Sequence, residues 1–204
     1  MSELNYYEII GLPCQPCVNS AELKANYLNL SSSVHPDRSP SDSDDTSNPI
    51  DASIVNEAHR VLSHIPSRLK YLLTLQTGST PGNLRHVPGE IGELFMNVGA
   101  LLQELDKVIK DKPPEESSEL ARVLFLKKSM TLRQKNESML SHLNCGIDAL
   151  HIRLERLNEE WKRQTRAEGV TSDAIERLAR LYHEWTFFDR WRGQLSQRLL
   201  ELTI

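Results

Sequence analysis

The sequence predicts an all-α protein, with an N-terminal helical hairpin plus short helices and a C-terminal antiparallel three-helix bundle. Two observations predict this fold class. Residues with high helix propensity, such as Leu, Glu, Lys, Arg and Gln, are abundant, and only nine of the 204 residues are glycine. Apolar residues also recur at steps of three and four over long stretches, which is the spacing of one buried helix face.

Four helices are predicted near the N-terminus, over residues 5–10, 20–34, 52–63 and 66–76. Pro36 stops the second helix, because the residue before a proline is disfavoured in the α conformation. Pro66 stands at a favoured N1 position and begins the fourth. The polar stretch 39–51 has no apolar periodicity and is expected to be a loop.

The C-terminal half shows three longer helical patterns. The first covers 94–108, the second is the tract 115–168, which Gly169 ends, and the last begins at a cap around Thr171. The tract has a seam with coiled-coil spacing, formed by Leu140, Leu143, Ile147, Leu150, Leu154, Leu157 and Trp161. Gly146 within it costs about 1 kcal/mol relative to Ala, which leaves room for a local break there.

A Gly- and Pro-rich stretch suggests the domain division. We predict an N-terminal domain at 1–77, a linker at 78–90 and the three-helix, coiled-coil-like bundle at 91–204.

Charge and hydropathy exclude several classes of function. The net charge is −4, and residues 1–80 carry five Lys or Arg against nine Asp or Glu, which argues against nucleic acid as a partner. No stretch approaches ~18 apolar residues, so neither a transmembrane helix nor a membrane partner is expected. The N-terminus lacks the features of a signal peptide, so we expect a cytoplasmic protein. Neither a phosphate-binding loop nor a nucleophile–base pair in a recognisable context is present, so we expect no enzyme and no cofactor.

Several motifs in the chain resemble one family. The second helix ends in His-Pro-Asp-Arg (35–38), a polar loop follows, and residues 5–13 read NYYEIIGLP. This arrangement resembles a J-domain, and VNEAHRVLSHIPSRLKYLL (55–73) resembles the third and fourth helices of the HscB/Jac branch, the co-chaperones of iron–sulfur cluster assembly. ELFMNVGALLQELDK (93–107) and FFDRWRGQLSQRLLEL (187–202) resemble segments of that branch's C-terminal three-helix bundle, whereas 115–168 is longer than its usual middle.

The resemblance implies a contact with the ATPase domain of a heat-shock-70 (DnaK/HscA-type) chaperone and stimulation of its ATP hydrolysis. The residues implied are His35, Pro36, Asp37, Arg38 and Lys24. The family usually has more cations near the tripeptide, whereas this chain has serines at 31–33 and a loop rich in aspartate. We therefore expect weaker and less salt-sensitive chaperone binding than is usual, or a partner with a less acidic surface.

The resemblance also implies that the bundle holds an iron–sulfur scaffold protein as client. The matching residues are Phe95, Met96, Gln103 and Phe187. Gly99 and Ala100 replace a large apolar residue and an acid of the family, so part of that surface is missing. For Phe187, packing in the core beside Phe188 is an equally good interpretation.

Cys14 and Cys17 are weak metal-ligand candidates. A tetrahedral zinc site needs four ligands, and this pair supplies two. Redox use would need a lowered thiol pKa, for which the sequence offers no evident cation. We favour two ordinary reduced thiols.

A second hypothesis for the whole chain belongs to another class. The seam in 115–168 suits a coiled-coil interaction or scaffold protein that forms a homodimer, with a J-domain that has drifted from chaperone use. The serines and the acidic loop favour this hypothesis, and the intact His-Pro-Asp opposes it.

Overall fold

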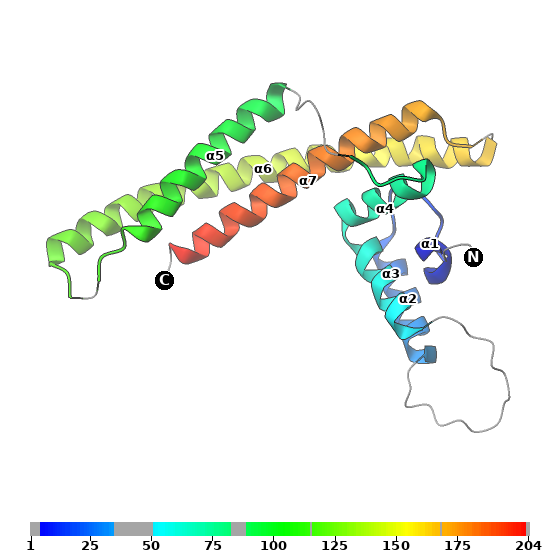
Figure 1. Ribbon diagram of the computed structural model, residues 1–204, viewed down its shortest axis with the longest axis horizontal. Coiled ribbons are helices and arrows are strands. Elements are labelled where there is room, and N and C mark those ends of the chain that lie inside the picture. Colours follow the sequence, from blue (N-terminus) through cyan, green and yellow to red (C-terminus); the bar gives the residue numbers. More distant parts are fainter. Residues whose placement is uncertain (1–4, 35–50, 83–88, 115, 168, 203–204) are drawn as a thin grey trace. The chain divides into compact units, whose positions relative to one another are not determined.

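The computed structural model describes residues 5–34, 51–82, 89–114, 116–167 and 169–202, and among them there are helices but no strands (Figure 1). The helices are α1 (Tyr6–Ile10), α2 (Ser20–Val34), α3 (Ala52–Ser63), α4 (Ile65–Thr77), α5 (Gly89–Lys110), α6 (Glu119–Ala167) and α7 (Ser172–Glu201). The predicted all-α fold class is confirmed. The predicted chaperone-contact residues His35, Pro36, Asp37 and Arg38 lie outside the described residues, as do residues 39–50 of the predicted loop.

The chain forms two compact units, and both α6 and α7 contribute to each. The first unit consists of Met1–Gly82 and Arg153–Tyr182, and the second of Asn83–Ile152 and His183–Ile204. The predicted division at 77 and 90 stays a prediction, because a compact packing unit need not be an independently folding domain.

In the first unit, α2 and α3 form the predicted hairpin, on which α1 and α4 pack (Figure 1). The Tyr27 hydroxyl donates to Asn56 Oδ1 at 2.9 Å, and the Tyr27 ring stacks on His59 at 4.1 Å between ring centroids. The Tyr6 amide donates to the Tyr71 hydroxyl at 3.0 Å, which joins α1 to α4. The core of these four helices is apolar and buried, and includes Tyr7, Ile10, Leu23, Val55, Ala58, Leu62, Leu69, Leu72 and Leu73.

Arg68 on α4 is a buried cation without a carboxylate partner among the described residues. Its side chain is 6% exposed. Nε donates to the carbonyl of Pro16 at 2.9 Å, and one terminal nitrogen donates to the carbonyl of Leu62 at 2.6 Å. Burial lowers the pKa of the guanidinium from its usual value. The side chain therefore ties the α1–α2 connection to the last turn of α3.

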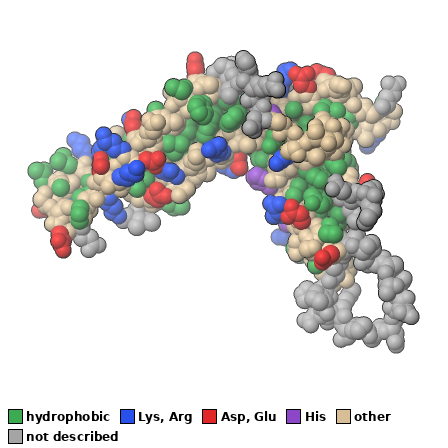
Figure 2. All heavy atoms as spheres, in the orientation of Figure 1, with side chains coloured by type: hydrophobic (Ala, Val, Ile, Leu, Met, Phe, Trp, Pro, Cys, Tyr) green, Lys and Arg blue, Asp and Glu red, His purple; other side chains and the backbone are tan. Residues whose placement is uncertain are grey.

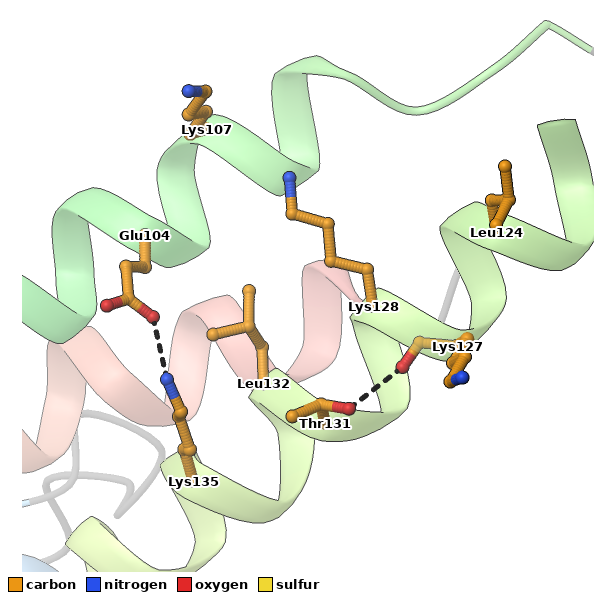
Figure 3. A pocket seen from close by; sticks show the side chains of 8 residues that line it. All are labelled: Glu104, Lys107, Leu124, Lys127, Lys128, Thr131, Leu132 and Lys135. Carbon is orange, nitrogen blue, oxygen red and sulfur yellow. Dashed lines mark hydrogen bonds and ion pairs between the residues drawn. The ribbon is translucent and has the colours of Figure 1, made fainter.

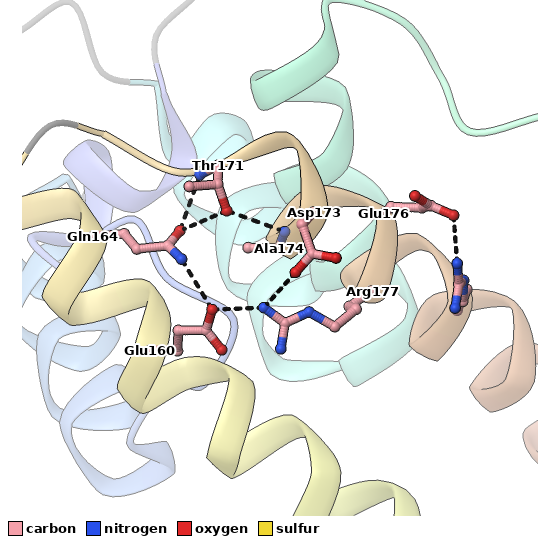
Figure 4. Close-up of polar contacts among 8 residues, drawn as sticks. Glu160, Gln164, Thr171, Asp173, Ala174, Glu176 and Arg177 are labelled. Carbon is pink, nitrogen blue, oxygen red and sulfur yellow. Dashed lines mark hydrogen bonds and ion pairs between the residues drawn. The ribbon is translucent and has the colours of Figure 1, made fainter.

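The α6–α7 turn belongs to the first unit and is closed by side-chain hydrogen bonds (Figure 4). Gly169, with a φ of 100°, follows the end of α6, and Thr171 Oγ1 accepts the amide of Ala174 and so caps α7. Gln164 Oε1 accepts the Thr171 amide at 2.9 Å. Arg177 pairs with Glu160 at 2.6 Å and so links α7 back to α6. The predicted stop at Gly169 and the predicted cap near Thr171 are confirmed.

The second unit is built around a core shared by α5, α6 and α7. Its buried residues are Ile91, Val98, Leu101, Leu105, Val108, Leu132, Leu143, Trp191 and Leu195. The predicted face of α5 is thus buried, and the predicted three-helix arrangement is present. Across both units, the seam of α6 from Leu143 to Trp161 is also buried. Because the chain's own helices cover this seam, it is not free for the self-association that the second hypothesis required.

The local break that Gly146 leaves room for does not occur. The helix α6 runs uninterrupted through this residue. A Cβ placed on Gly146 would lie 2.2 Å from Cε1 of Phe188 on α7. The glycine is therefore a site of close helix packing, and the favourable contact with α7 outweighs its low helix propensity.

Candidate functional site

The end of α2 is the part of the predicted chaperone site that the structure describes. The helix ends at Val34, directly before His35, and α3 begins after Asp51, whose Oδ1 accepts the amide of Ser53 at 3.2 Å. Ser32 and Ser33 donate their hydroxyls to carbonyls one turn earlier, at 2.8 and 2.7 Å. The two helices are antiparallel, so Val34 and Asp51, which flank residues 35–50 in the sequence, lie at the same end of a hairpin.

Lys24 is exposed on the outer face of α2, as a chaperone contact requires. It borders an open hollow lined by Leu23, Tyr27, Leu28 and His59, among others. Leu28 in this hollow is 54% exposed. Lys24 is the only cation in α2, and Glu22 offsets it. This helix therefore lacks the net positive charge that would steer it towards an acidic surface over long distance.

Two of the four predicted client residues meet at one tryptophan in the second unit. The Phe95 ring on α5 lies 6.1 Å from the ring of Trp191 on α7, and the Phe187 ring stacks on Trp191 at 5.7 Å. Phe95 is 54% exposed, whereas Trp191 is 4% exposed. The result is an aromatic ridge with a buried base and an exposed rim. Trp191 was not among the predicted residues, although its spacing of four from Phe187 places both on one face of α7.

Met96 and Gln103 lie on the outer face of α5. Met96 is 69% exposed, and Gln103, seven residues later on the same face, is also exposed. Between them, Gly99 has open space where a Cβ would be. The predicted client residues therefore form a shallow surface that runs from the aromatic ridge across α5. Phe187 is half-buried and packs against the core of the second unit, which is one of the two interpretations given for it.

The Cys14–Cys17 segment contacts the end of the α6–α7 hairpin within the first unit. The amide of Cys17 donates to Asn158 Oδ1 at 2.9 Å, and the indole nitrogen of Trp161 donates to the carbonyl of Cys14 at 3.3 Å. Asn158 is 4% exposed and Trp161 is 1% exposed. The backbone of the segment therefore serves as a docking site for α6.

The thiols of this segment are not activated. Burial raises the pKa of both Cys14 and Cys17 above the usual thiol value. For Cys17 the charge of Arg68 opposes this shift without reversing it. Among the described residues, no group of three or more His, Cys, Asp or Glu side chains is placed to hold a metal ion. The same part of the chain contains no helix that is long and apolar enough to cross a bilayer.

Comparison with known proteins identifies the N-terminal helices. Residues 5–71 match the family model of the DnaJ domain. The co-chaperone protein HscB homolog of Acinetobacter baumannii is 37% identical over 73 residues, which are 36% of this chain and 41% of that protein. The chain therefore spans about two fifths of the length of the curated relatives it matches.

Two solved structures extend the similarity to the rest of the fold. Human co-chaperone protein HscB matches with a TM-score of 0.60 and 16% identity, over 97% of this chain and 83% of that chain. Chaperone HscB from Vibrio cholerae matches with a TM-score of 0.51 and 18% identity, over 95% and 96%. At these identities the two structures show a shared fold.

The family match over residues 5–71, together with the α2–α3 hairpin, shows that this part of the chain is a J-domain. The chain is similar in sequence to HscB homologs over its N-terminal part, and over most of its length it shares the fold of the two HscB structures. The predicted resemblance to that family is confirmed.

Proposed function

We propose that the chain is a cytoplasmic co-chaperone that binds a DnaK/HscA-type heat-shock-70 chaperone through its J-domain and stimulates the chaperone's ATPase. The observation that carries this proposal is the DnaJ domain at 5–71, in which α2 ends directly before His35-Pro36-Asp37. Pro36 fixes its own φ near −65°, which favours a rigid corner for the two polar side chains. The partner carries out the hydrolysis, so the chain itself is not an enzyme in this proposal.

The test is single-turnover ATP hydrolysis by such a chaperone, with and without the chain. We expect the wild type to stimulate hydrolysis and His35→Gln to abolish the stimulation. His142→Gln, at an exposed histidine of α6, is the matched control and should behave as the wild type. Absence of stimulation, or equal stimulation by His35→Gln, would overturn the proposal.

We further propose that the surface of α5 and α7 holds an iron–sulfur scaffold protein as the client. Exposed Phe95 and Met96, beside half-buried Phe187, provide an apolar centre, and Gln103 provides a polar edge. Such a centre with a polar rim is the arrangement found at protein interfaces. Gly99 adds no side chain between Met96 and Gln103, so a partner can approach the backbone of α5 there.

Titration calorimetry with a purified scaffold protein tests this second step. Met96→Asp should weaken scaffold binding by at least about tenfold, because it places a charge in the apolar centre. Leu200→Asp, at a similarly exposed leucine of α7, should leave it unchanged. Equal effects of the two variants would contradict the assigned surface. Stimulation of the ATPase in the absence of the client should be unaffected by either variant, so the two steps can fail separately.

A further inference from the structure

The first turns of α6 carry an exposed surface that the proposed function does not use. Five large apolar side chains between residues 120 and 130 are 55–68% exposed: Leu120, Val123, Leu124, Leu126 and Met130. Single exposed apolar residues are ordinary, but a contiguous group of this kind marks an interaction site. We call residues 120–136 the apolar–basic segment.

The charge of this segment is strongly positive. It contains five cations and no Asp or Glu, which gives +5; the cations are Arg122, Lys127, Lys128, Arg133 and Lys135. Two of them form exposed ion pairs, Arg133 with Glu137 at 2.9 Å and Lys135 with Glu104 at 3.1 Å. Each of these pairs offsets one cation locally, which leaves a charge of about +3 along the segment (5 − 2). Within the described ranges, no carboxylate forms an ion pair with the other three cations.

This charge decides between two kinds of occupant. A second copy of the chain on the same surface would bring two positively charged segments together, which is unfavourable. An anionic surface would be attracted instead. The acids Glu119 and Glu137 stand at the two ends of the segment and so define its length.

The exposed apolar side chains form two adjacent rows on one face of the helix, with Leu120 and Leu124 in the first. Leu124 lines a hollow between α5 and α6, with Lys107, Lys128 and Lys135 at its border (Figure 3). The row of Val123, Leu126 and Met130 lines a second hollow. Lys127 borders both.

An acidic helix or peptide lying in one hollow would leave the other row exposed. A planar surface contacts both rows at once, and long cationic side chains between and beside the rows can extend to its charged groups. In Figure 2, hydrophobic and basic side chains lie together on the surface where α6 begins. Apolar side chains interleaved with cations are characteristic of a helix that lies in a bilayer interface.

We propose that the apolar–basic segment binds the surface of an anionic lipid bilayer. The apolar side chains enter the boundary between headgroups and acyl chains, and the cations contact lipid phosphates and carboxylates. The sequence predicted no membrane partner because that expectation considered spanning segments. A peripheral contact needs only exposed apolar side chains and positive charge. Leu132 and Asn136 are buried, so the opposite side of α6 is the one that is exposed.

Co-sedimentation of the full chain with vesicles tests the proposal. One set is phosphatidylcholine alone, and the other contains about one third phosphatidylserine. We expect at least about tenfold tighter binding to the anionic vesicles at low salt, with most of it lost at high salt. Leu126→Ser/Met130→Ser and Lys127→Gln/Lys128→Gln should each reduce the binding by at least about tenfold.

Matched variants control for these effects. Ile152→Ser changes another exposed apolar residue of α6, 51% exposed, and Lys70→Gln/Arg190→Gln removes two exposed cations elsewhere. Both should bind as the wild type does, and circular dichroism should show that all variants are folded. Failure of the wild type to bind anionic vesicles overturns the proposal, even if it binds an acidic peptide instead. It is also overturned if the controls lose binding equally, or if light scattering shows a dimer that Leu126→Ser/Met130→Ser dissociates. Chaperone stimulation should be unchanged in all variants, so this inference is independent of the proposed function.

Discussion

The beginning of α6 and its later part differ in which side chains they bury. In residues 143–161 the apolar seam is buried, with Leu143 at 0% and Leu154 at 2% exposure. In residues 120–136 large apolar residues are exposed, whereas Ser129 and Asn136 are buried at 6% and 0%. The later part is held by hydrophobic packing in the usual sense. The beginning buries fewer large apolar side chains. Its exposed apolar residues therefore indicate a contact with an external surface.

The largest expected effect comes from removing a buried leucine of the later part. Leu143→Ala should lower the free energy of unfolding by about 2–5 kcal/mol, because it leaves a cavity in the shared core. Leu124→Ala makes the same chemical change at a side chain that is 61% exposed, and should stay within about 0.5 kcal/mol. Urea denaturation followed by circular dichroism measures both. Similar losses for the two variants would remove the distinction between the two parts of α6.

Gly146 tests the close approach of α6 and α7. Alanine improves helix propensity by about 1 kcal/mol but forces its Cβ against Phe188, which costs about 1–3 kcal/mol. We expect Gly146→Ala to lower the free energy of unfolding by about 1 kcal/mol. In a Phe188→Ala background the same substitution should instead raise it, by up to about 1 kcal/mol. If the sign is the same in both backgrounds, Phe188 is not the cause.

Ser129 tests the polar core at the beginning of α6. Its hydroxyl is buried and has no hydrogen-bond partner among the described residues. Ser129→Ala should therefore raise the free energy of unfolding by about 0.5–1 kcal/mol in thermal or urea denaturation. Ser138→Ala, at an exposed serine of the same helix, separates helix propensity from burial and should give a smaller gain. An equal gain at Ser138 would mean that the buried hydroxyl is not a source of instability.

The smallest effect is expected at the exposed apolar rows. Leu126→Gln and Met130→Gln, at side chains 58% and 64% exposed, should each change the free energy of unfolding by less than about 0.5 kcal/mol. Both should be measured at two protein concentrations. A loss comparable to that of Leu143→Ala would show that these side chains are buried in solution, contrary to the structure.

Local patterns in the sequence predicted the helices closely. The seam from Leu143 to Trp161, the stop at Gly169 and the cap at Thr171 all depend on neighbours within a few turns, and the structure confirms them. Gly146 misled the prediction because helix propensity is a local quantity, whereas its contact with Phe188 is made across the bundle.

The candidate site was only partly predictable for the same reason. Resemblance to a family supplied Phe95 and Phe187, but their common partner Trp191 becomes evident only when α5 and α7 are packed together. The contact of Cys17 with Asn158 joins residues 141 positions apart, and no local signal marks it. The two cysteines were candidates because of their thiols, whereas in the structure it is their backbone groups that form the hydrogen bonds with α6.

The hydrogen bonds of Arg68 restrict which substitutions this position can accept. Its guanidinium reaches two carbonyls, those of Pro16 and Leu62, that come from different parts of the chain. A lysine there has one nitrogen in place of a rigid fork, and a leucine would leave both carbonyls without a donor in a dry environment. Neither replacement restores what is lost, so position 68 is expected to stay arginine for as long as the α1–α2 connection keeps its present path. Substitutions at position 68 and in the α1–α2 connection are therefore coupled, because the Arg68 side chain joins the two.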